Sequence, residues 1–137
     1  MTNEPPFHSP DRGWRQKFAD AFRGVWMGIR DQSSFRVHFA AAVLVLIVGT
    51  ALGLDRLEWS LLVLAIGGVL VAEMFNTALE HLAKAVDRSH NPYVGNALDI
   101  GSAAVLLAAL TAVVLGAIIL GYRLGGLAES WGLWPVP

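Results

Sequence analysis

The sequence has 137 residues, a net charge of −1 and no cysteine. Its hydrophobic fraction is 55 % and its charged fraction is 15 %, whereas a soluble domain carries about 25 % charged residues. This composition excludes an ordinary soluble domain, a disulfide framework and a zinc site built on cysteine. The near-neutral charge gives no sign of a nucleic-acid partner, and we expect none.

The first part of the chain predicts a flexible tail and then a helix on the membrane surface. Residues 1–13 are polar and rich in proline, and they lack the pattern of a cleaved signal peptide, so we expect the first apolar span to be retained. From residue 14 to about residue 36, apolar residues recur at spacings of three and four, with arginine and lysine largely between them. This pattern is typical of an amphipathic interfacial helix. A soluble amphipathic helix is the alternative, and the apolar block that follows directly favours the interfacial one.

Three apolar blocks follow, at about residues 37–54, 59–83 and 99–122. Each is long enough to cross a bilayer, which takes about 20 residues. Polar residues join them at 55–58 and at 84–98, where Asn91, Pro92 and Gly95 indicate a turn. Residues 123–137 form a C-terminal tail rich in glycine and tryptophan. The predicted fold class is therefore an all-α membrane protein with three transmembrane helices preceded by an interfacial helix.

The positions of the basic residues predict the orientation in the membrane. Lys84 and Arg88 lie between the second and third spans, and only Arg56 and Arg123 lie on the opposite side. The remaining six precede the first span: Arg12, Arg15, Lys17, Arg23, Arg30 and Arg36. The positive-inside rule then puts the N-terminus and the 84–98 connection in the cytoplasm and the C-terminus outside.

Polar residues collect on one face at the cytoplasmic end of the second span. Glu73, Asn76 and Glu80 follow the spacing i, i+3, i+7 and fall within about 60° of one another around a helix, with Lys84 close to the same face. Ionisable residues in a membrane helix are costly and therefore indicate function. Carboxylate and carboxamide oxygens can hold Mg²⁺, and a carboxylate can act as a general base.

Each of these residues also has a simpler interpretation. Asp99 at the start of the third span is a candidate helix N-cap. Glu73 can form an interhelical hydrogen bond as a protonated acid, and Glu80 with Lys84 can form a solvated pair. A path for protons or ions is a further alternative, but such a path should continue across the bilayer, and these residues stop at one end. Their position on one face at one depth favours a chemical site.

The motif EMFNTALE at 73–80, followed by DIGSAAVLLAAL at 99–110, resembles the signature of the prokaryotic diacylglycerol kinase family, which includes undecaprenol kinases. The resemblance implies a homotrimer in the bacterial inner (plasma) membrane, with active sites between subunits at the cytoplasmic side. It implies that ATP with Mg²⁺ phosphorylates the hydroxyl of a membrane lipid, either undecaprenol or diacylglycerol. It also implies that Glu73 is the catalytic base, that Glu80 binds the metal, and that Asn76 and Asp99 shape the nucleotide and metal site.

The sequence departs from that family pattern at three positions. Gln32 replaces a glutamate that usually binds the metal, Leu98 replaces a lysine that usually reaches the phosphates, and Lys84 stands where an aspartate is usual. An amide oxygen can still coordinate Mg²⁺, so we retain Gln32 as a weaker metal ligand. We expect Lys84 to supply the phosphate-binding charge lost at Leu98. The alternative is a degenerate member that keeps the fold and binds lipid or nucleotide without efficient catalysis.

Overall fold

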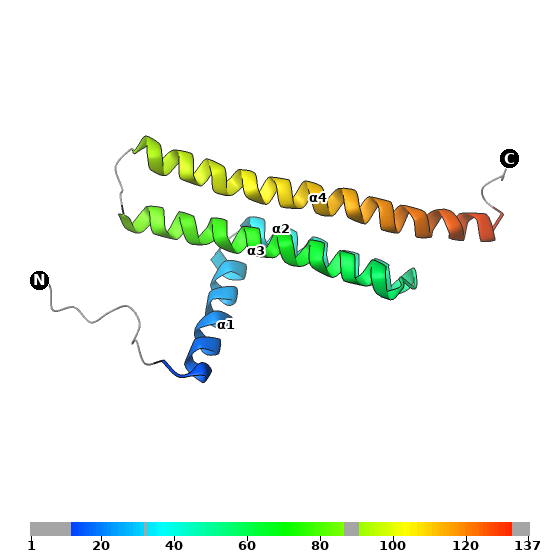
Figure 1. Ribbon diagram of the computed structural model, residues 1–137, viewed down its shortest axis with the longest axis horizontal. Coiled ribbons are helices and arrows are strands. Elements are labelled where there is room, and N and C mark those ends of the chain that lie inside the picture. Colours follow the sequence, from blue (N-terminus) through cyan, green and yellow to red (C-terminus); the bar gives the residue numbers. More distant parts are fainter. Residues whose placement is uncertain (1–11, 32, 87–90, 133–137) are drawn as a thin grey trace, which may run out of the picture.

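The computed structural model describes residues 12–31, 33–86 and 91–132, and the described chain forms four helices. They are α1 (Trp14–Asp31), α2 (Ser33–Ala51), α3 (Arg56–Val86) and α4 (Pro92–Ser130). Helix α3 packs against both α2 and α4, and α1 runs across the direction of these three long helices (Figure 1). Helices α2, α3 and α4 are each long and apolar enough to cross a membrane. The predicted fold class is confirmed.

Helices α3 and α4 extend well beyond the predicted apolar spans. Helix α3 has 31 residues and α4 has 39, which corresponds to about 46 Å and 58 Å at a rise of 1.5 Å per residue. The hydrocarbon core of a bilayer is only about 30 Å thick. Both helices are therefore longer than the hydrocarbon core is thick, because backbone hydrogen bonding in a helix does not stop where the apolar residues end.

The start of α4 shows why the predicted boundary was too late. Asn91 is the N-cap, and its side chain accepts a hydrogen bond of 3.0 Å from the backbone N–H of Tyr93. Pro92 follows in the first turn, where its missing N–H costs nothing. Gly95 lies inside the helix, so the turn predicted there is wrong. Because α4 also continues to Ser130, most of the predicted C-terminal tail that the structure describes is helical.

Helix α1 carries an apolar face that the rest of the described chain does not cover. Trp14 is 75 % exposed and Phe22 is 74 % exposed. The ammonium group of Lys17 lies 5.1 Å from the centre of the Trp14 ring. On the polar side, Asp20 forms ion pairs with arginine side chains, one of them to Arg12 at 2.7 Å. Exposed aromatic residues beside a basic polar face are typical of a helix lying in the membrane interface.

The predicted surface helix over 14–36 is two helices in the structure. Helix α1 ends at Asp31 and α2 begins at Ser33, and α1 runs across the direction of α2 (Figure 1). Phe35 in the first turn of α2 is 3 % exposed. A Cβ atom at Gly28 of α1 would lie 2.7 Å from Sδ of Met74, so this glycine lets α1 approach α3 closely. We call Gly28 with Ser33–Phe35 the elbow.

The three long helices enclose apolar surface along most of their length. Leu54, Leu62 and Ile119 form a buried cluster near the start of α3. An apolar groove of about 320 Å³ follows α3 between α2 and α4. It is lined by small and aliphatic side chains, and His38 is the one polar residue among them. The acidic and basic side chains of the three long helices lie outside this groove, toward the two ends of the bundle.

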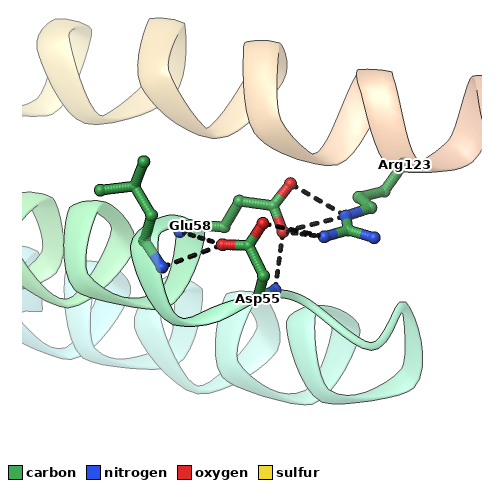
Figure 2. A network of polar contacts seen from close by, with 4 residues as sticks. Asp55, Glu58 and Arg123 are labelled. Carbon is green, nitrogen blue, oxygen red and sulfur yellow. Dashed lines mark hydrogen bonds and ion pairs between the residues drawn. The ribbon is translucent and has the colours of Figure 1, made fainter.

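One polar cluster lies at the end of the bundle where α3 begins (Figure 2). Asp55 Oδ1 accepts the backbone N–H groups of Leu57 and Glu58 at 2.9 Å, and Glu58 Oε2 accepts the backbone N–H of Asp55 at 2.8 Å. This reciprocal arrangement is a capping box. Arg123 of α4 donates to both carboxylates, with bonds of 2.9 and 2.5 Å to Glu58 and 3.3 Å to Asp55. The cluster fixes the start of α3 against α4.

Candidate active site

The most buried charged side chain of the described chain is Glu73, which is 2 % exposed. It lies in α3 beside Met74, at the level where the elbow meets α3. Its Oε1 atom accepts a hydrogen bond from the hydroxyl of Ser34, in the first turn of α2. The carboxylate is therefore buried in the bundle and held by a specific donor. Such a carboxylate is suited to accept a proton from a hydroxyl group.

One turn further along α3, Asn76 and Glu80 contact each other. The Asn76 Nδ2 group donates to Oε1 of Glu80 at 3.2 Å. Asn76 is 9 % exposed, and its Oδ1 atom is buried with no hydrogen-bond donor among the described residues. A buried acceptor without a donor is costly and calls for a reason, such as a bound ion or ligand. The same oxygen lies against α4, because a Cβ atom at Gly101 would be 2.6 Å from it.

Two of the predicted site residues lie at the edge of this group. Lys84 and Asp99 are both exposed, and within the described residues neither side chain forms a hydrogen bond or an ion pair. Leu98 is partly buried, and its carbonyl accepts the Ser102 hydroxyl at 3.0 Å. The alternative role of Asp99 as a helix N-cap is wrong, because α4 begins at Pro92 and Asp99 lies inside it. Gln32 lies outside the described residues.

The structure adds two residues that sequence reasoning passed over. Ser34 contacts Glu73 from a position 39 residues away in the chain, and no pattern in the sequence indicates that pairing. Thr77 is 7 % exposed and lies on the same face of α3 as Glu73 and Asn76. Its spacing of four from Glu73 was a usable signal, because residues at i and i+4 share a helix face.

The described residues offer two oxygen ligands for a magnesium ion and no complete cage around it. Among the described residues no three His, Cys, Asp or Glu side chains come together as a metal cage. Mg²⁺ does not need such a cage, since it usually keeps several waters and binds one or two carboxylates together with substrate phosphates. Glu80 and the unpaired Oδ1 of Asn76 are oxygen ligands of the right kind. These two residues could hold the ion.

Comparison with known proteins gives a consistent result. The family model described as prokaryotic diacylglycerol kinase matches residues 19–120. The chain is 36 % identical over 104 residues to the undecaprenol kinase of Bacillus subtilis, which covers 76 % of this chain and 85 % of that protein. It is 30 % identical over 104 residues to the diacylglycerol kinase of Escherichia coli K12, covering 73 % of this chain and 85 % of that protein.

A diacylglycerol kinase of Synechocystis is 33 % identical over 105 residues, which is 73 % of this chain and 60 % of that longer protein. The matched region contains α2, α3, most of α1 and α4 up to Leu120, so it includes every candidate site residue. The resemblance carried by EMFNTALE and DIGSAAVLLAAL is confirmed. The chain therefore belongs to the prokaryotic diacylglycerol kinase family, a family of lipid kinases that transfer phosphate to an alcohol group.

Proposed function

We propose that this chain transfers the γ-phosphate of ATP to the hydroxyl of a membrane lipid, in a reaction that depends on Mg²⁺. One observation carries the proposal: Glu73 is a buried carboxylate that already accepts a hydrogen bond from a hydroxyl group, at the depth where a surface helix meets the spans. A lipid hydroxyl reaches this depth because the headgroup lies at the membrane interface.

In the proposed reaction Glu73 acts as the general base. The lipid oxygen forms a bond to the γ-phosphorus of ATP while the bond from that phosphorus to the β–γ bridging oxygen breaks, and ADP leaves. The hydroxyl proton passes to the Glu73 carboxylate. Phosphoryl transfer requires positioning and charge neutralisation more than covalent chemistry. A buried carboxylate that a hydrogen bond holds in one orientation supports the first of these requirements.

Asn76 and Glu80 are proposed to hold Mg²⁺ with the nucleotide. When bound, the metal neutralises negative charge on the phosphates. Glu80 lies one turn from Asn76, and Lys84 lies one further turn along, where its exposed ammonium group can approach the phosphates in place of the missing lysine at Leu98. Asp99 is proposed to orient the nucleotide from α4. Gln32 is proposed as an additional weak ligand.

Undecaprenol is the first lipid to test. The identity to the undecaprenol kinase of Bacillus subtilis is 36 %, against 30 % to the diacylglycerol kinase of Escherichia coli, over matches of 104 residues each. Both lipids present a primary hydroxyl on an apolar body, and Glu73 can accept the proton of either. The two substrates must therefore be compared directly.

We also propose a homotrimer with its N-terminus in the cytoplasm. The exposed positions of Lys84 and Asp99 support an assembly in which a neighbouring subunit completes the site.

The basic residues at the Glu73 end of the bundle support the proposed orientation, with the N-terminus in the cytoplasm. The chain has no cysteine, so single cysteines placed at Gly13 and at Ser130 would report each side without background. A membrane-impermeant thiol reagent should label intact cells at Ser130→Cys and spare Gly13→Cys.

The test of the proposed activity is transfer of labelled γ-phosphate in mixed micelles. Undecaprenol and diacylglycerol are offered separately, with and without Mg²⁺, to the wild type, to Glu73→Gln and to Glu129→Gln. Glu129 is an exposed carboxylate at the far end of α4 and serves as the matched control. We expect Mg²⁺-dependent transfer that falls by at least about a hundredfold in Glu73→Gln and is unchanged in Glu129→Gln.

Absence of transfer to both lipids by folded wild-type protein would contradict the proposal. Binding of ATP by the same sample would then favour the degenerate member of the family, which retains the fold and binds nucleotide without efficient catalysis. Transfer that survives in Glu73→Gln would contradict the role of Glu73 as the base.

A further inference from the structure

We infer that Ser34 is a positioning residue for the Glu73 carboxylate, an assignment that rests on the proposed kinase function. The observation is the hydrogen bond from the Ser34 hydroxyl to Oε1 of Glu73. Ser34 does not touch the reacting atoms in this assignment. It acts by fixing the group that takes the proton.

The Ser34 hydroxyl is held in place by the elbow. Its neighbour Phe35 is 3 % exposed, which anchors the first turn of α2 in the packed interior. Gly28 allows α1 to contact Met74, the residue next to Glu73. Two adjacent residues of α3 therefore meet the elbow, one through a hydrogen bond and one through packing. The backbone at Ser34 therefore cannot move far from Glu73 without separating α1 and α2 from α3, and the Ser34 hydroxyl, although its residue is exposed, lies within hydrogen-bonding reach of the carboxylate.

The Glu73 carboxylate, in contrast, can rotate about the terminal torsion of its side chain. The terminal torsion of glutamate is broad, so packing alone does not select one orientation of the two oxygens. A hydrogen bond to Oε1 selects one, and it leaves Oε2 to accept the proton of the lipid hydroxyl. Holding a catalytic group in its reactive geometry before the substrate arrives lowers the barrier to reaction. Loss of the bond should therefore slow turnover more than it weakens binding.

A purely structural role for Ser34 would look different. Ser33 and Ser34 both lie in the first turn of α2, where serine commonly satisfies backbone N–H groups. The hydroxyl of Ser34 instead donates to a side chain of another helix. Substitution of a residue that only supports the helix should lower stability and leave the kcat of folded protein unchanged.

The experiment compares Ser34→Thr with Ser34→Val in the full chain, in the mixed-micelle transfer assay. These two side chains have the same shape and differ by the hydroxyl group. We expect Ser34→Thr to retain turnover and Ser34→Val to lose about tenfold in kcat, the loss expected for one hydrogen bond to a charged group. The KM values for lipid and ATP should stay within about twofold. Ser33→Ala is the matched control and should keep the wild-type kcat, because the described structure shows no hydrogen bond from the Ser33 side chain to Glu73.

The outcomes separate this inference from the proposed function. Equal kcat values for Ser34→Thr and Ser34→Val, beside an active wild type, would overturn the inference and leave the kinase proposal standing. A rise in the KM for lipid with unchanged kcat would also overturn it, because Ser34 would then be a binding contact. A wild type that transfers phosphate to neither lipid would overturn the proposed function and this assignment together.

Discussion

Arg123 of α4 donates hydrogen bonds from its Nε and Nη2 groups to the Glu58 carboxylate of α3, at distances of 2.5 to 2.9 Å. The two residues are 65 positions apart in the sequence. The pair lies at the start of α3, some 15 residues from Glu73, or about 22 Å along the helix. It therefore contributes to the packing of α3 on α4 and not to the chemistry at Glu73.

The first prediction concerns the stability that this ion pair provides. Arg123→Ala removes the bidentate partner of the Glu58 carboxylate and should lower the free energy of unfolding, because the capping box at the start of α3 then loses its contact with α4. Arg56→Ala is the control, because Arg56 is exposed in the same region and its side chain makes no described polar contact. Thermal unfolding in detergent micelles measures both. Equal midpoints for the two variants would show that the pair adds nothing measurable.

The second prediction concerns the close approach of α4 to Asn76. A Cβ atom at Gly101 would lie 2.6 Å from Oδ1 of Asn76, so Gly101→Ala must displace the carboxamide and disturb its 3.2 Å bond to Glu80. We expect the protein to stay folded while the Mg²⁺ concentration needed for half-maximal activity rises several-fold. Gly95→Ala in the same helix meets nothing within 4 Å and should leave that concentration unchanged. The test is a Mg²⁺ titration of the activity of both variants. Identical curves would show that Asn76 does not contribute to metal binding.

The third prediction concerns Lys84 as the replacement for the usual phosphate-binding lysine. Lys84→Ala should raise the apparent KM for ATP about tenfold, because a positive charge near the phosphates is lost. His81→Ala is the control, since His81 is exposed one turn earlier and lies off the face formed by Glu73, Asn76 and Glu80. Initial rates at varied ATP measure the effect. An unchanged KM for ATP in Lys84→Ala would mean that another cation, and not Lys84, binds the ATP phosphates.

The fourth prediction concerns the contact between the surface helix and α3. Gly28→Val places a branched side chain where even an added Cβ atom would lie 2.7 Å from Sδ of Met74. This overpacking should cost about 1–3 kcal/mol in the free energy of unfolding. Gly24→Val makes the same change in the same helix, at a position with nothing within 4 Å, so it corrects for the helix propensity of valine. Similar unfolding midpoints would show that α1 does not rest on α3 at this point.

The sequence by itself determined the features that depend on neighbours along the chain. Hydropathy and length identified three spans, and the helical period identified a face shared by Glu73, Asn76 and Glu80. Some local signals were present and were misread. Asn91 followed by Pro92 marks a helix start, and recognising it would have excluded Asp99 as an N-cap.

Only the tertiary structure decided which of these residues meet. The packing of α2 on α3 brings Ser34 to Glu73, and the packing of α4 on α3 brings Arg123 to Glu58. Helical periodicity indicates which face of a helix a residue occupies. It carries no information on the offset between two helices, that is, how far one helix is shifted along the other. That offset depends on close contacts such as Gly101 with Asn76 and Gly28 with Met74, which exist only once the helices are packed.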